Sequence, residues 1–293
     1  MEDLREPADG RAERSAESLA RVEAILARQP ELDFAVELSD AQVEEFRTRG
    51  FTRAERIVPD AELAWLRELY DWLFETRAEA VPGGYFDLSR PYESEGADLQ
   101  PQILAPEARF PSLRKTAFFR NGRRLAARLL GVERSDLRGW GHMIRKPARK
   151  GAPLPWHQDE AYWDPAFEYT ALGCWLPLDA ATLETGCMRF VPGSQHGGVR
   201  VHRHLGDDPN VHAIVTDDVD ESLAVSVPLA AGGAIFHHCR ILHSSLANRS
   251  AHARRAYANE FQLAPVARAV TPERPWLDAG NRAWEARRRS RKA

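Results

Sequence analysis

Residues 232–264 read GGAIFHHCRILHSSLANRSAHARRAYANEFQLA, and this stretch sets the expectation for the fold. Two runs of strand formers, GGAIFHHC and RRAYANEFQLA, flank a polar middle. Earlier runs of the same kind follow Gly139, and they are GWGHMIRKP (139–147), TALGCWLPL (170–178), CMRFVPGS (187–194) and LAVSVPL (223–229). Many short strands separated by Gly and Pro are typical of an all-β sandwich or barrel.

The N-terminal half has helical patterns instead, at residues 39–50, 59–80 and about 111–130. The first reads SDAQVEEFRTRG, in which Ser39 and Gln42 form a capping box and Gly50 can end the helix. The second carries leucines at helical spacing, with Asp60 as its expected cap. The expected fold class is therefore mainly β with flanking helices.

The chain divides into three expected parts. Residues 1–38 are an N-terminal extension, helical or disordered, and residues 39–275 form a single domain. Residues 276–293 form a basic C-terminal tail, which we expect to be solvated and frayed. Within the domain, the polar and acidic stretch 196–222 interrupts the strand pattern and predicts a long loop or lid.

Composition excludes several classes of protein. The 293 residues carry a formal net charge of -3, which disfavours nucleic acid or a membrane surface as a partner. Three cysteines, none in a CxxC pair, indicate a reducing compartment. No stretch approaches the length of a membrane span, and the N-terminus lacks the apolar region of a secretory signal. We expect a soluble, cytoplasmic protein, and its oligomeric state stays open.

A possible metal site begins with the HxD pair of His157 and Asp159. On a strand, positions i and i+2 share a face, so the imidazole and the carboxylate would point at one spot. Two histidines and one carboxylate hold Fe(II) by one face and leave the other positions open. His243, in the late segment HHCRILHSS, offers the third ligand. By itself an HxD pair is weak, because chance copies are common.

The ordered set of motifs resembles the phytanoyl-CoA dioxygenase family of Fe(II)/2-oxoglutarate oxygenases. The resemblance covers about residues 39–265, and its motifs are SDAQVEEFRTRGF, VPDAELAWLRELYD, MIRKP, WHQDEAYW, CWLPLD, GCMRFVPGSQHGG, GGAIFHHCRILHSSLANRS and RRAYANEFQ. It implies a double-stranded β-helix, which is a cupin-like jelly roll with flanking helices.

The resemblance also assigns residues. His157, Asp159 and His243 become the iron ligands and the catalytic centre, with His237 and His238 as packing or supporting residues. Arg254 becomes the clamp for the distal carboxylate of 2-oxoglutarate, because its planar fork meets a carboxylate with two hydrogen bonds. We expect His243 to open a fresh short strand, and His243 and Arg254 to face one pocket from adjacent strands. The other expected co-substrate contacts are Trp175, Ser245, His142 and Gln102. Core packing explains Trp175 equally well, and Gln100 and Gln102 read equally well as surface residues.

The activity that the resemblance implies is oxidation of a small metabolite, most often hydroxylation, with Fe(II), 2-oxoglutarate and O2 and with release of succinate and CO2. Three rival classes of protein differ from this expectation at particular residues. A halogenase of this type lacks the carboxylate ligand, whereas Asp159 is present. A non-catalytic cupin-like protein would lack a ligand or the arginine, and a zinc hydrolase would not need Arg254. Trp156, Tyr162 and Trp163 are candidate walls for a polar or anionic substrate.

Overall fold

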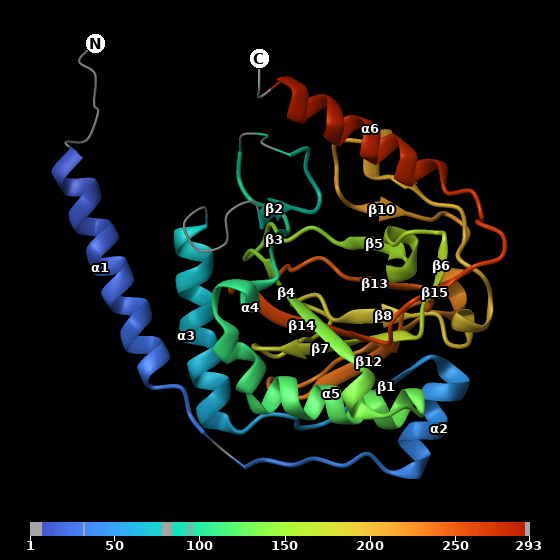
Figure 1. Ribbon diagram of the computed structural model, residues 1–293, viewed down its shortest axis with the longest axis horizontal. Coiled ribbons are helices and arrows are strands. Elements are labelled where there is room, and N and C mark those ends of the chain that lie inside the picture. The colour runs from blue at the N-terminus through green and yellow to red at the C-terminus, as the bar shows by residue number, and fades with distance from the viewer. Residues whose placement is uncertain (1–7, 32, 78–83, 93, 95, 291–293) are drawn as a thin grey trace.

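The computed structural model describes residues 8–31, 33–77, 84–92, 94 and 96–290, and its centre is a sandwich of two antiparallel sheets (Figure 1). The large sheet has the order β1-β12-β7-β14-β4-β3-β2 and the small one β11-β8-β13-β5. This is the expected jelly roll with flanking helices.

The strands are short, as the runs of strand formers predict. Those of the large sheet are β1 (Phe51–Ala54), β12 (Ala234–His238), β7 (Ala171–Pro177), β14 (Arg254–Gln262), β4 (Arg138–Lys146), β3 (Pro101–Leu104) and β2 (Tyr85–Asp87). Those of the small sheet are β11 (Val225–Val227), β8 (Met188–Phe190), β13 (His243–Ser245) and β5 (Leu154–His157). Two further pairs are β9 (Arg203–His204) with β10 (Ile214–Val215), and β6 (Phe167–Glu168) with β15 (Val266–Ala267).

Side-chain alternation along β14 shows how the large sheet separates two interiors. Tyr257 and Phe261 point to the core that the sheet shares with the helices. Ala256 and Ala258 point the other way, into the core between the two sheets. Because successive residues of a strand face opposite sides, Arg254 and Glu260 share the inner face with the two alanines.

Helices cover the outer face of the large sheet. They are α2 (Asp40–Arg49), α3 (Asp60–Thr76) and α5 (Ala117–Leu130), and Figure 1 shows them below and beside the sheet. The capping box of Ser39 and Gln42 is present, and Gly50 ends α2 in the left-handed conformation at φ 82°. Both features confirm the expectation for this helix.

Two helix boundaries differ from the expectation. Pro59, not Asp60, occupies the cap position of α3 and makes no side-chain cap bond. Residues 111–115 form a 3-10 turn, and α5 begins only after Thr116, whose hydroxyl accepts a hydrogen bond from the Phe119 N–H. Residues 78–80 of the expected second helix lie outside the described residues.

The terminal segments are more ordered than a frayed tail would be. Helix α1 (Ala8–Ala27) packs on α3, where Trp65 Nε1 donates to the Ile25 carbonyl at 2.7 Å. Helix α6 (Pro275–Ser290) has the buried Trp276 in its first turn, whereas most of its described residues from 281 on are exposed. The tail is therefore solvated, as expected, but it is helical and not frayed as far as Ser290. None of the described helices is long and apolar enough to cross a membrane.

The structure of the expected lid also differs from the prediction of one long loop. Residues 196–222 contain the β9–β10 hairpin and short 3-10 turns instead of one irregular loop.

A buried carboxylate joins two of the helices. Glu62 on α3 accepts from the Ala117 N–H at 2.6 Å and from the Phe118 N–H at 2.9 Å. These are N–H groups of the first turn of α5, which have no partner within their own helix. Glu62 thereby acts as a cap supplied from a neighbouring helix.

Glu62→Ala should lower the free energy of unfolding by about 2–4 kcal/mol, because it leaves two buried N–H groups without an acceptor. Urea denaturation measures the change. The control is Glu68→Ala on the same helix, whose exposed ion pair with Arg28 should contribute less than about 1 kcal/mol. Equal losses in the two variants would contradict the capping role.

Candidate metal centre and co-substrate cavity

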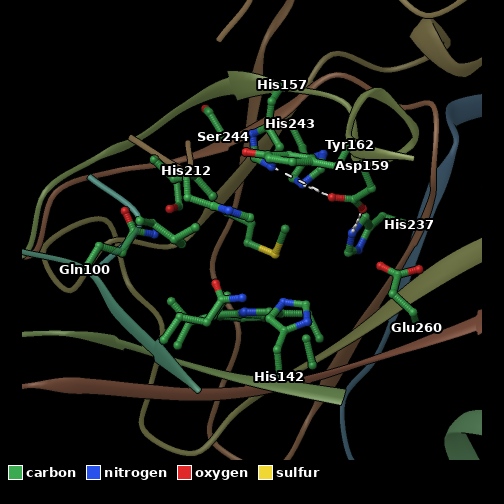
Figure 2. Close-up of a pocket in the computed structure, with 18 of the residues that line it drawn as sticks. Gln100, His142, His157, Asp159, Tyr162, His212, His237, His243, Ser244 and Glu260 are labelled. Atoms are coloured by element: carbon green, nitrogen blue, oxygen red, sulfur yellow. Dashed lines mark hydrogen bonds and ion pairs between the residues drawn. The ribbon is translucent and has the colours of Figure 1, made fainter. Parts of the chain in front are cut away.

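A cavity of about 320 Å³ lies between the two sheets (Figure 2). The large sheet contributes lining residues from β3, β4, β7, β12 and β14, and the small sheet contributes them from β5, β8 and β13. All eight residues that the sequence predicts for the site line this one cavity, and they are Gln102, His142, His157, Asp159, Trp175, His243, Ser245 and Arg254.

Two histidines face each other across paired strands. His157 is the last residue of β5, His243 is the first of β13, and the antiparallel register places them directly opposite. Their ring centroids are 4.1 Å apart. The expectation that His243 opens a fresh short strand is confirmed.

Asp159 lies near both histidines but outside β5. It begins a 3-10 turn (Asp159–Tyr162) after β5, so the expectation of an HxD pair on one strand is wrong. The turn still brings Asp159 Oδ1 to 3.5 Å from His243 Nε2 and 3.8 Å from His157 Nε2. One ligand atom from each of the three lies within 4.8 Å of the others.

The hydrogen bonds of the two rings leave the correct nitrogen free for a metal. His157 Nδ1 lies 2.8 Å from the Pro155 carbonyl and His243 Nδ1 lies 3.1 Å from the Ile241 carbonyl. A carbonyl oxygen only accepts, so each Nδ1 carries the proton and each Nε2 presents a lone pair. Burial lowers the pKa of His157, and lowers the pKa of His243 to about 3, which keeps both rings neutral.

The donor set fits a divalent metal. Burial alone would raise the pKa of Asp159, but the hydrogen bond from His237 holds that pKa below its ordinary value, so the carboxylate is ionised. Two neutral imidazoles and one carboxylate are the ligands of non-haem Fe(II) sites that keep open positions.

The turn that carries Asp159 is held by the C-terminal segment. Arg274 donates to the Trp163 carbonyl at 2.9 Å and also to the carbonyl of Glu160. Trp276 Nε1 donates to the Ala161 carbonyl at 2.8 Å. Arg274, just before α6, and Trp276, in its first turn, therefore bind the backbone carbonyls of Glu160, Ala161 and Trp163, in the turn and directly after it.

Arg254 supplies a buried positive charge at the cavity wall. Its side chain stacks over Trp175 at 5.1 Å and donates to the Gly186 carbonyl at 2.6 Å, while its Nε has no protein partner. Burial lowers the pKa of Arg254 to about 10, so it stays charged at neutral pH. No ion pair found among the described residues neutralises it, which is costly for a buried cation unless an anion binds.

Arg255 has the opposite orientation, as alternation along a strand requires. It binds Asp179 at 2.7 Å and Asp71 at 2.7 Å on the helix side of the sheet. The expectation that His243 and Arg254 stand on adjacent strands is wrong, because β13 and β14 belong to different sheets. The two residues approach the cavity from opposite walls.

The remaining predicted co-substrate contacts also line the cavity. His142 is buried on β4 with Nδ1 unpartnered, and burial lowers its pKa to about 4, so it is neutral. Gln102 on β3 is buried opposite Ile144 of β4, and both Gln102 and Gln100 line the cavity. Ser245 lines the cavity from β13.

Of the three expected substrate walls, Tyr162 and Trp163 line the cavity. Trp156 does not, because it packs with Val191 and Leu242 under the guanidinium of Arg189.

Two titratable residues of the cavity, Glu260 and His212, were not predicted from the sequence. Glu260 is buried on the inner face of β14, and its Oε2 has no partner. Counting in steps of two from Arg254 would have found it, since 254, 256, 258 and 260 share a face. His212, from the segment expected as a lid, stacks on Tyr162 with ring centroids 5.4 Å apart and bonds Tyr92 Oη. No local motif marks it.

The jelly roll and its His–Asp–His group place the chain in the structural class of cupin-like oxygenases. The family model for phytanoyl-CoA dioxygenase (PhyH) matches residues 46–256. This chain belongs to that family.

Relatives and solved structures agree with this assignment. Phytanoyl-CoA dioxygenase domain-containing protein 1 of Bos taurus is 31% identical over 155 residues, 52% of each chain. L-proline trans-4-hydroxylase of Streptomyces griseoviridis is 34% identical over 128 residues, 37% of this chain and 48% of the enzyme. The chain thus spans about half the length of the curated relatives it matches. The crystal structure of EvdO2 from Micromonospora carbonacea var. aurantiaca, complexed with 2-oxoglutarate, is 37% identical with a TM-score of 0.73, covering 84% of this chain and 99% of EvdO2.

Replacing His157, Asp159 or His243 by alanine should lower Fe(II) affinity by at least about 100-fold, because each removes one of three ligands. Anaerobic titration against a chromophoric chelator measures this affinity. The control is His238→Ala, since His238 faces away from the cavity and lies near Phe46, with ring centroids 6.4 Å apart. Retention of iron by the three ligand variants would contradict the assignment.

Proposed function

We propose that this chain is an Fe(II)- and 2-oxoglutarate-dependent dioxygenase that oxidises a small molecule, most simply by hydroxylation. The observation that carries the proposal is the buried, unneutralised Arg254 in the same cavity as the His–Asp–His group. A metal site alone is compatible with zinc hydrolysis, whereas a metal site with a buried cation on the opposite wall matches a co-substrate that has a chelating end and a distal carboxylate.

Each residue then has a defined task. His157, Asp159 and His243 would hold Fe(II), and Arg254, backed by Trp175, would bind the distal carboxylate of 2-oxoglutarate. Ser245, His142 and Gln102 would contribute hydrogen bonds to the co-substrate. When bound, Fe(II) with 2-oxoglutarate and O2 would supply the oxidising power to convert a C–H bond of the substrate into a C–OH group, with release of succinate and CO2. The surrounding side chains position the target bond and exclude side reactions.

The domain bounds and the cellular location follow from the same proposal. Residues 39–275 would form the catalytic domain, with segments 1–38 and 276–293 as flanking parts. The three cysteines are buried and unpaired, which supports a reducing, cytoplasmic location. Asp159 supports oxygenation over halogenation, because it occupies the position that a halide would need.

Charges in the cavity narrow the substrate class. Among its lining residues Arg254 is the one arginine or lysine, and the co-substrate would use it. His142 and His212 are neutral, because burial lowers the pKa of each to about 4. Burial, and then the nearby Asp159, raise the pKa of Glu260 well above its ordinary value, so its carboxyl group adds no negative charge. An anionic substrate, which the sequence left open, would therefore meet no counter-charge, and we favour an uncharged polar substrate.

Arg254→Ala should raise the KM for 2-oxoglutarate on the order of 100-fold and leave Fe(II) affinity nearly unchanged, because a desolvated charge partner is lost. Succinate release at varied 2-oxoglutarate measures this. Arg255→Ala is the matched control on the next position of the strand, and its KM should stay within a few-fold of the wild type. The opposite order of effects would mean that Arg255 binds the co-substrate.

A panel of small molecules tests the charge preference. Uncharged polyols, amides and glycosides should stimulate succinate release more than carboxylates or phosphate esters of similar size, because the cavity offers the latter no cation beyond Arg254. The panel is assayed with the wild type at saturating 2-oxoglutarate. Strongest stimulation by an anionic compound would contradict the preference.

A further inference from the structure

The two oxygens of Asp159 have different neighbours. Oδ1 lies 3.5 Å from His243 Nε2 and 3.8 Å from His157 Nε2, so it faces the point that the two lone pairs share. Oδ2 lies 3.1 Å from Nε2 of a third histidine, His237 (Figure 2). One oxygen is thus available to a metal while the other is engaged by the protein.

The tautomer of His237 differs from that of the two ligand histidines. An ionised carboxylate only accepts hydrogen bonds, so His237 Nε2 must carry the proton that it donates to Oδ2. That nitrogen then has no lone pair for a metal. His237 Nδ1 is buried and has no hydrogen-bond partner among the residues that the structure describes, in contrast to the carbonyl-bound Nδ1 of His157 and His243. His237 is therefore built as a donor to Asp159, not as a fourth ligand.

Packing fixes the His237 ring in this position. His237 lies on β12 directly opposite Gly173 of β7, and a Cβ at residue 173 would lie 2.4 Å from His237 Cε1. The same Cβ would lie 3.2 Å from Glu260 Oε1. Gly173 thereby leaves room for the imidazole and for the carboxyl group of Glu260. Phe190 contacts the ring from the other sheet, with centroids 5.8 Å apart.

Glu260 places a second carboxyl group near the N–H of His237 and near Asp159. One ligand atom each of Asp159, His237 and Glu260 lie within 4.8 Å of one another, so two acidic groups lie close together beside the metal site. The N–H of His237 is directed at Asp159 and holds that carboxylate with Oδ1 toward His157 and His243. Without this N–H, Oδ2 would be free to turn toward the metal as well.

We propose that His237 is a positioning residue that holds Oδ2 of Asp159, so that the aspartate presents a single oxygen to the metal. The inference rests on the proposed iron site. Its consequence is that the aspartate occupies one position on the metal, which leaves the others for co-substrate and oxygen. Hydrogen bonds of this kind to a ligand typically contribute 10–100-fold to metal affinity.

The test compares donors at position 237. His237→Gln places an amide N–H at about the reach of Nε2, whereas His237→Leu fills similar space with no donor. Fe(II) affinity, measured by anaerobic chelator competition, should fall about 10–100-fold in His237→Leu and recover to within a few-fold of the wild type in His237→Gln. The visible spectrum of Co(II) bound in place of iron should change in His237→Leu and resemble the wild type in His237→Gln. His238→Ala, one residue along the same strand, is the matched control and should leave both readouts unchanged.

Two results would overturn the proposal. One is an Fe(II) affinity of His237→Leu within twofold of the wild type. The other is a His237→Gln variant as weak as His237→Leu, which would mean that ring packing matters and the donor does not. If His237→Leu does not fold, His237→Asn replaces it, because its shorter amide does not reach Oδ2. Failure of the wild type to bind iron or to turn over 2-oxoglutarate would instead count against the proposed function, so the two failures are distinguishable.

Discussion

The antiparallel pairing of β5 with β13 is the constraint on which the candidate site depends. It sets His157 opposite His243, and a slip of one residue would turn one imidazole out of the cavity. Asp159 can complete the group only because the chain leaves the strand into a 3-10 turn immediately after His157. The small sheet thus supplies the metal ligands from two short strands and one turn.

The large sheet supplies the complementary wall through β14. Its inner face carries Arg254 at one end and Glu260 near the other, with Ala256 and Ala258 between them. Small side chains in the middle of the strand leave space between the sheets where the cavity lies. On its outer face, Tyr257 and Phe261 pack into the core that the sheet shares with the helices. This packing holds in place the strand that carries Arg254.

Much of this could be predicted from the sequence because the informative residues are local. Strand runs, the capping box at Ser39 and the order of the motifs indicated a jelly roll with flanking helices, and all predicted site residues line one cavity. Some errors are local, such as the cap of α3 and the turn that carries Asp159. The others concern long-range geometry. Which sheet β13 and β14 join depends on pairing between distant segments, and the roles of His212 and Glu260 depend on what the fold brings beside them. The hydrogen bond of His237 to Asp159 is likewise invisible in a sequence, since 78 positions separate the two residues.

Arg274 and Trp276 donate hydrogen bonds to backbone carbonyls at the turn that carries Asp159, and these bonds connect the metal site to the C-terminal helix α6. Proteins open locally in cooperative units, and terminal segments are usually among the first to open. Here the opening of α6 would free the carbonyls of the turn that carries Asp159, so the local unfolding free energy of the C-terminal segment enters the apparent metal affinity. By the same linkage, a bound metal would stabilise the C-terminal helix against fraying and against proteolysis.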